Sequence, residues 1–241
     1  MAFYCKTFNK SSLKERKEFY EKEFSVSKIK KWFKSNNLPL PQLCALDPGS
    51  ETKIILDKKL KNNLLYFSFN QLPRKIKQYI PEDVYYDRNI YKDYKKILKT
   101  LKFNNYISQE LAFDVDADNI ICDHPKNKSV CKKCLNKIYK AALKMKGEIN
   151  DLGFKKIEIV YSGRGFHVHV MDKKASLLSV KERSSLNKKF KKFPIDPWVS
   201  RGYIRLIRMP YSLNSLVSRK TMPIKTKKFS SKTGVPKFLK N

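Results

Sequence analysis

Two aspartates, Asp114 and Asp116, have the type and spacing that metal-dependent chemistry requires. They lie within and just after the apolar run 111–115, which is bounded by polar residues and therefore predicts a buried strand. Side chains alternate along a strand, so both carboxylates would face the same way, about 7 Å apart along the chain. Carboxylates held this close repel each other, and a divalent cation lets both remain ionised. Taken alone, an Asp-x-Asp pair more often marks a strand that ends in solvated aspartates.

A cluster of cysteine and histidine residues has the ligand set of a closed tetrahedral zinc site, three thiolates and one imidazole. Its members are Cys122, His124, Cys131 and Cys134. The chain holds five cysteines, an odd number, and shows no secretory signal, which favours a metal site in a reducing compartment over disulfide bonds. We therefore expect one structural Zn²⁺ in a knuckle over residues 122–134, in an intracellular protein. The alternative is a set of free cysteines near a loop.

A glycine turn between two predicted strands, 157–161 and 166–170, offers groups suited to binding phosphate. Glycines permit a tight turn whose backbone N–H groups approach phosphate, and a hydroxyl, a guanidinium and an imidazole add donors. These residues are Ser162, Gly163, Arg164, Gly165 and His167. His169 shares a strand face with His167, so it either faces the same site or is a core histidine. A Gly-x-Gly turn alone is also common in ordinary hairpins.

A third stretch, residues 194–214, contains one acidic residue, Asp196, among basic and apolar neighbours. Arg205 and Arg208 follow it at a spacing that could direct both into one cleft. The alternative is an ordinary basic strand.

The elements that must position these residues can be predicted from hydrophobic periodicity and from cap and turn residues. Helices are expected at 11–35, divided by a cap at Ser25 or Ser27, and at 71–79, 133–150 and 179–190. Strands are expected at 53–56, 64–69, 84–86, 111–115, 157–161, 166–170 and 198–208, with a basic helix or loop at 90–101. Strands and helices do not alternate regularly, so the expected fold class is α+β.

The charge of the chain indicates its partner. Lys and Arg outnumber Asp and Glu by 53 to 22, a formal net charge of +31 over 241 residues. A chain this basic needs a polyanionic partner, and nucleic acid is the default. An anionic membrane surface is the competing partner, but no apolar run approaches about 18 residues and no signal peptide opens the chain. We therefore expect no membrane association.

Four motifs, in this order along the chain, resemble those of the catalytic small subunit of archaeal and eukaryotic DNA primases. They are Phe113-Asp-Val-Asp116, the Cys/His knuckle, the turn Tyr161-Ser-Gly-Arg-Gly-x-His167 and the stretch 196–214. The resemblance covers roughly residues 105–215, and the preceding segment 81–86 is also similar. An Asp-x-Asp pair is common in polymerases, whereas its combination with the Ser-Gly-x-Gly-x-His turn is specific.

The resemblance implies a role for each matching residue. The catalytic carboxylates, which would hold two Mg²⁺ or Mn²⁺ ions, are Asp114, Asp116 and Asp196. The residues matching nucleotide-binding positions are Ser162, Gly163, Arg164, His167, Arg205 and Arg208, together with Asn214, where the family usually has a histidine. Ser50-Glu51 is the nearest, weak match to the family's Arg-Glu-Phe element.

By the same resemblance, residues 1–241 are expected to form one catalytic domain of mixed and antiparallel sheets flanked by helices. Its N-terminal lobe would cover about residues 1–80, and the helical insertion common in the family would be absent between His169 and Asp196. The implied function is template-directed synthesis of short RNA, or DNA, primers from nucleoside triphosphates on single-stranded DNA. The implied protein partner is a primase large subunit, or a missing or fused domain, that carries an iron–sulfur centre.

Two alternatives stay open at this point. The first is a primase-polymerase relative that acts in repair, translesion synthesis or plasmid or viral replication and makes mainly DNA. The second is a non-catalytic, zinc-stabilised nucleic-acid-binding module, against which the intact set of three carboxylates argues.

Overall fold

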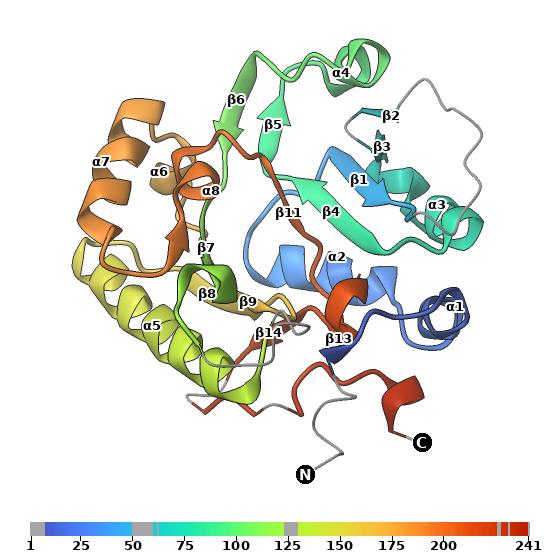
Figure 1. Ribbon diagram of the computed structural model, residues 1–241. Coiled ribbons are helices and arrows are strands. Elements are labelled where there is room, and N and C mark those ends of the chain that lie inside the picture. Colours follow the sequence, from blue (N-terminus) through green and yellow to red (C-terminus); the bar gives the residue numbers. More distant parts are fainter. Residues whose placement is uncertain are drawn as a thin grey trace.

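The computed structural model describes residues 8–49, 60–61, 63–122, 130–225, 228–230 and 232–240. Over these residues most strands belong to two antiparallel sheets that lie beside each other, with helices packed around them (Figure 1). We call them the β4 sheet and the β7 sheet, after the strands that carry the most site residues. The predicted α+β class is confirmed.

The β4 sheet combines strands from both halves of the chain. In spatial order its strands are β13 (Arg219–Lys220), β12 (Leu213–Asn214), β4 (Asp83–Asp87), β1 (Leu43–Asp47), β3 (Leu64–Ser68) and β2 (Leu60–Lys61), with β11 (Leu206–Arg208) also paired to β4. The strands predicted at 64–69 and 84–86 are confirmed as β3 and β4, whereas the strand predicted at 53–56 lies outside the described residues.

The β7 sheet carries the acidic strand and the glycine hairpin. In spatial order its strands are β10 (Ile195–Asp196), β7 (Leu111–Asp116), β9 (Gly165–Val170), β8 (Ile157–Tyr161) and β14 (Met222–Ile224). The strand predicted at 111–115 and the hairpin predicted from 157 to 170 are therefore confirmed.

The N-terminal helices begin at serine caps. Ser12 and Glu15 form a capping box at α1 (Leu13–Lys22), and the Ser25 side chain accepts from the backbone N–H of Lys28 at α2 (Val26–Ser35). Such a cap stabilises a helix by about 1 kcal/mol. The division of the predicted helical region at Ser25 is thus confirmed. The predicted helix at 71–79 is α3 (Leu72–Tyr79).

Helix α2 packs where the two sheets meet. Its buried face, which includes Ile29, Trp32 and Phe33, shares one core with Leu46 of the β4 sheet and Val160 of the β7 sheet. A single hydrophobic cluster therefore joins the sheets behind the site.

The outer face of the β7 sheet is covered by α5 (Lys132–Asp151), the element predicted at 133–150 (Figure 1). Its predicted apolar stripe is buried: Ile138, Ala142, Met145 and Ile149. The predicted helix at 179–190 is α7 (Val180–Phe190), and the Phe190 ring lies 5.3 Å from that of Phe113 on β7. The remaining α-helices of the described residues are α4 (Tyr94–Thr100), α6 (Lys173–Ser176) and α8 (Pro197–Arg201), and β5 (Asn89–Tyr91) pairs with β6 (Tyr106–Gln109). Short 3₁₀ turns lie at Phe69–Gln71, Ala117–Asn119, Ser215–Val217 and Lys237–Leu239.

The prediction of one strand over 198–208 is wrong. Helix α8 begins at Pro197 because the Asp196 side chain accepts from the Trp198 backbone N–H at 2.8 Å and proline is favoured in a first helical turn. The helix ends at Gly202, whose φ of +92° suits glycine, and only residues 206–208 form a strand. Residues 90–101, predicted as a helix or loop, include the end of β5 and α4.

One connection between the sheets is very short. β13 at the edge of the β4 sheet is followed by the buried Thr221, and β14 of the β7 sheet begins at the next residue. Thr221 is held by backbone hydrogen bonds with Tyr211 and Ser212. No helix in the described part of the chain has the length and apolar character needed to cross a membrane.

Candidate active site

Strand register places three predicted site residues in one row across the β7 sheet. Asp114 on β7 is paired with Asp196 on β10 and with His167 on β9. Directly paired residues of an antiparallel sheet carry their side chains on the same face. Asp116 lies two residues further along β7, so it shares that face. The three carboxylates are therefore brought together by rigid strands.

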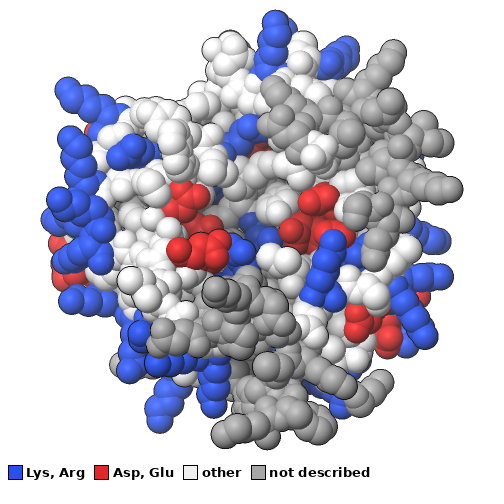
Figure 2. Space-filling view, in the orientation of Figure 1, with Lys and Arg blue, Asp and Glu red and all other residues white. Residues whose placement is uncertain are grey.

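These side chains form one wall of a cleft of about 370 Å³. The other wall comes from the β4 sheet, and the cleft residues there include Asp83, Tyr85, Arg208 and Asn214. Figure 2 shows this face of the molecule, with acidic side chains on both sides of a central hollow and basic side chains between them. The cleft therefore combines groups that hold cations with groups that hold anions.

Burial and neighbouring carboxylates both act on Asp114. Burial, followed by the charges of Asp116 and Asp196, raises the pKa of Asp114 to about 8. Its Oδ1 atom is buried and has no hydrogen-bond partner among the described residues, and the nearest imidazole nitrogen, His167 Nε2, is 3.8 Å away. A buried carboxylate oxygen without a donor is an unsatisfied acceptor. These residues therefore fit a divalent cation, which would supply the missing positive charge.

Arg164 already balances part of this charge. One of its terminal nitrogens donates to Asp116 at 3.0 Å and to Asp118 at 2.6 Å. Although burial opposes the charged form, the two carboxylates raise the pKa of Arg164. The guanidinium is thus held over the acidic edge of the cleft, beside the glycine turn.

Arg208 enters the cleft from the opposite wall, where Asp83 accepts hydrogen bonds from both of its terminal nitrogens. The Tyr85 hydroxyl donates to the same carboxylate at 3.0 Å. Asp83 and Tyr85 fall in segment 81–86, which resembles the family but which by itself predicts no site role for either residue. Alternation along β4 puts them on one face, but their place in the site depends on the pairing of β4 with β11, which no local pattern predicts.

The expectation that Arg205 and Arg208 enter one cleft is wrong. Arg205 lies three residues before Arg208, so along an extended chain the two side chains point to opposite faces. Arg205 instead donates to the buried Asp87 at 2.9 Å and its guanidinium carbon lies 3.4 Å from the centre of the Phe103 ring. It does not line the cleft.

The glycine turn forms as predicted. The Ser162 backbone N–H donates to Gly165 O, and the Gly165 N–H donates to Ser162 Oγ at 3.1 Å. At Gly165 a Cβ atom would lie 2.3 Å from the carbonyl oxygen of Val115, so only glycine allows β9 to approach β7 this closely. At Gly163, φ is +103° and a Cβ would lie 2.9 Å from that of Asn214. The turn is therefore fitted against both walls of the cleft.

Asn214 lies in the cleft beside this turn. Its amide nitrogen donates to Ser162 O at 2.9 Å, and its Oδ1 atom has no hydrogen-bond partner among the described residues. The side chain therefore supports the turn and leaves one buried acceptor directed at the site.

The two histidines of β9 have different surroundings. His167 lines the cleft, and burial, then the charges of His169, Arg208 and Arg88, hold its pKa well below the usual value. His169 is fully buried away from the cleft, with Nδ1 2.6 Å from Glu110. The reading of His169 as a core histidine is the one that the structure supports.

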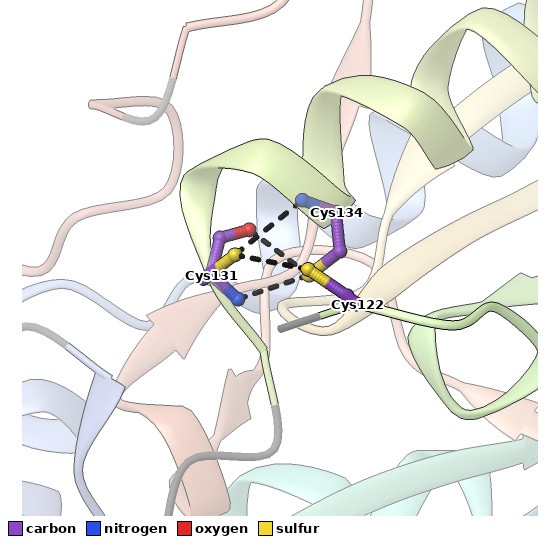
Figure 3. A group of neighbouring side chains, drawn as sticks. All are labelled: Cys122, Cys131 and Cys134. Atoms are coloured by element: carbon purple, nitrogen blue, oxygen red, sulfur yellow. Dashed lines mark hydrogen bonds between the residues drawn. The ribbon is translucent and has the colours of Figure 1, made fainter. Parts of the chain in front are cut away.

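Three of the predicted zinc ligands lie together at the start of α5 (Figure 3). The Sγ atoms of Cys122, Cys131 and Cys134 are all within 4.8 Å of one another. Burial would raise the pKa of Cys131, but hydrogen bonds from the Cys134 backbone and the neighbouring thiols lower it below its ordinary value. Burial raises the pKa of Cys134 to about 12. Three thiols gathered in this way can hold one zinc ion. His124, the fourth predicted ligand, lies outside the described residues. Glu51, of the weak match to the family's Arg-Glu-Phe element, also lies outside them.

Comparison with known proteins agrees with this site. The profile of the family described as DNA primase small subunit matches residues 113–196, which run from the acidic strand to Asp196. An uncharacterised DNA primase small subunit-like protein of Archaeoglobus fulgidus is 35% identical over 89% of this chain and 84% of its own length. The DNA primase small subunits of Pyrococcus abyssi and Pyrococcus furiosus are 31% and 30% identical over 71% of this chain. The chain spans less than half of the length of these two subunits, 47% and 46%.

The matches extend beyond isolated motifs, because one relative is aligned over most of both chains. The acidic strand, the glycine turn and Asp196, which the fold gathers in one cleft, all fall within aligned regions. The chain belongs to the DNA primase small subunit family.

Proposed function

We propose that this protein is the catalytic subunit of a DNA primase, which joins nucleoside triphosphates into a short primer on a single-stranded DNA template. The observation that carries the proposal is the cleft itself, in which Asp114, Asp116 and Asp196 face Arg208 and the glycine turn. Nucleotidyl transfer needs cations at the reacting phosphate and cationic donors on the leaving pyrophosphate. The cleft holds carboxylates that would bind the cations, and arginines that would serve as the cationic donors.

Asp114, Asp116 and Asp196 would hold Mg²⁺ or Mn²⁺. Ions bound there would lower the pKa of the substrate's attacking 3′-hydroxyl and neutralise charge on the reacting phosphate. The sheet keeps the three carboxylates on one face, so no rearrangement of the backbone is needed to present them. The protein then needs no general base of its own.

Arg164, Arg208 and His167 would bind and orient the triphosphate. The pKa of His167 is depressed by burial, so its imidazole is neutral and can donate one N–H without adding charge. The Ser162 hydroxyl, which accepts from the Gly165 N–H and keeps its own proton to donate, would complete a phosphate-binding turn with the backbone at Gly163, and Asn214 would add a polar contact. Together these groups fix the α-phosphate for in-line attack.

The remaining features fit roles around this reaction. One structural Zn²⁺ on Cys122, His124, Cys131 and Cys134 would fasten the segment after β7 to the start of α5. The net charge of +31 would hold the template by its phosphates without reading its sequence. A large subunit, or a further domain with an iron–sulfur centre, is the expected protein partner.

A second candidate function is a primase-polymerase that extends strands in repair or in plasmid or viral replication. What favours it is that the relative aligned over most of both chains is named only as DNA primase small subunit-like.

The test is nucleotide incorporation on a single-stranded template, with and without an annealed primer, using ribonucleotides and deoxyribonucleotides separately and Mg²⁺ or Mn²⁺. De novo products support primase activity. Extension of annealed primers alone, with deoxyribonucleotides, supports the second candidate. A purified, folded protein that does neither, but binds DNA, contradicts both and leaves the binding module.

A further inference from the structure

Two aromatic side chains, Trp198 and Tyr203, are exposed at the rim of the cleft. Each is 57% exposed, and their ring centres lie 5.5 Å apart. Their chain neighbours Val199 and Ile204 line the cleft itself. A pair of large aromatic rings held next to each other in solvent is unusual for a surface and indicates a binding partner. Trp198 follows Asp196, the third carboxylate, by two residues along the chain.

The loop that carries the rings is fastened from below by buried polar side chains. Arg88, 2% exposed, donates to the carbonyls of Val199 at 2.8 Å and Ile204 at 2.5 Å. Gln109 donates to Gly202 O at 3.1 Å, and Asn187 donates to Pro197 O at 3.1 Å. The Asp196 carboxylate caps the start of the same loop. The rings therefore stand on a backbone that is fixed before any partner arrives, which lowers the entropic cost of binding.

Positive charge on the helix that packs against α8 indicates the kind of partner. Helix α8, which carries Trp198, packs on α7. Exposed lysines follow along α7 and just beyond it, at Lys181, Lys188, Lys189 and Lys191. Aromatic rings beside a basic surface match single-stranded nucleic acid, whose bases stack on the rings while its phosphates meet the cations. An apolar protein partner would leave these lysines without a counter-charge.

We propose that Trp198 and Tyr203 form a stacking platform for an unpaired base of the template strand as it enters the cleft. This inference rests on the proposed function, since it assigns the template to that cleft. Base stacking does not depend on base identity, so the platform suits a template of any sequence.

The two tryptophans of the chain make the platform directly observable. Trp32 is 5% exposed in the core, so a ligand that quenches tryptophan fluorescence by stacking acts on Trp198. Titration with single-stranded oligothymidylate should quench the wild-type emission. Trp198→Phe should lose the quench and keep affinity within about threefold, measured by polarisation of a labelled oligonucleotide. Trp198→Ala with Tyr203→Ala should weaken binding about tenfold or more.

Two controls separate stacking from other effects. Leu177→Ala removes a side chain of similar exposure, 60%, outside the cleft and should leave affinity unchanged. Loss of stacking should not change the slope of affinity against salt concentration, whereas Lys188→Ala with Lys189→Ala should reduce that slope. Equal thermal unfolding of all variants establishes that each one is folded.

The outcomes distinguish this inference from the proposed function. Asp114→Asn keeps the platform and should still be quenched although it is inactive. A wild-type protein that incorporates nucleotides without a quench, and whose double alanine variant binds as well as wild type, overturns the platform while the function stands. A quench with no incorporation under any condition supports the platform and contradicts catalysis.

Discussion

The molecule has two candidate metal sites that are built in different ways. The cysteine cluster brings three sulfur atoms within 4.8 Å of one another, and no other group of three donors in the described residues is gathered so closely. The carboxylates are spread along a cleft by the register of β10, β7 and β9. One arrangement suits a single ion enclosed by protein, and the other leaves room for substrate between the ligands. Closely gathered ligands are thus expected of a structural site, and ligands spread along a cleft of a reactive one.

Substitution of a carboxylate in the cleft should reduce activity more than any other change considered. Asp114→Asn should lower nucleotide incorporation at least a hundredfold, because it removes an anionic ligand without changing the shape of the site. The unfolding temperature of the variant, measured without divalent ions, should not be lower than that of wild type, because the substitution also removes repulsion from Asp116 and Asp196. Primer synthesis at one tenth of wild type or more would contradict the assignment.

His167→Ala tests how the cleft binds an anionic substrate, whereas Asp114→Asn tests how it binds metal ions. Loss of one donor to an ionised phosphate costs about 1.5–3 kcal/mol, so kcat/KM for nucleotide should fall roughly ten- to a hundredfold with template binding unchanged. Arg164→Ala should do at least as much, and Arg164→Lys should restore activity only in part because a point charge does not replace a planar fork.

Two further variants serve as controls for this result. Arg205→Lys lies outside the cleft and should leave the KM for nucleotide unchanged. His169→Ala should lower stability, because it leaves Glu110 without its imidazole partner, and should affect KM less than His167→Ala. An equal loss of DNA binding in His167→Ala would mean that the hairpin holds the template.

The cysteine cluster should respond through stability. Cys131→Ser removes one thiolate and the contacts at the first turn of α5, and we expect the free energy of unfolding to fall by about 2 kcal/mol. Hydrogen exchange should increase in residues 130–135 first, while residues 111–116 stay protected. Metal analysis of wild type should find one zinc per chain. A protein purified without chelator that holds no zinc would contradict the assignment of the cysteine cluster as a structural metal site.

A smaller effect should appear in the pH dependence of the ion-free protein. The pKa of Asp114 is raised to about 8, whereas an unfolded aspartate has a pKa of about 3.9. Between these values the folded state binds more protons, so this group makes stability fall as pH rises from about 5 to about 8. Asp114→Asn should therefore be more stable than wild type, by an amount that grows as the pH rises across this range. Denaturation in chelator at both pH values measures the gain, and adding Mg²⁺ should reduce it; a gain independent of pH would contradict this account.

Local patterns were sufficient for much of the cleft. Alternation placed Asp114 and Asp116 on one face, and the cap at Ser25 separated α2 from the helix before it. Asp196-Pro197 is also a local helix-start signal, and reading it as such would have avoided the incorrect strand. The opposite wall was beyond local reasoning, because Asp83 and Arg208 meet only through pairing between strands more than a hundred residues apart. The spacing of three residues between Arg205 and Arg208 would have placed them on opposite faces of an extended chain, but it does not predict that Asp87 is the partner of Arg205.

The short connection through Thr221 has a mechanical consequence. One segment of the chain ends the β4 sheet at Lys220 and begins the β7 sheet at Met222, so a single residue connects the two sheets. Helix α2 also packs into a hydrophobic core shared by both sheets. The two walls of the cleft therefore have little freedom to move apart as rigid bodies. The distance between the carboxylates and Arg208 is thus set when the chain folds, and the proposed substrate would enter a cleft whose width is already determined.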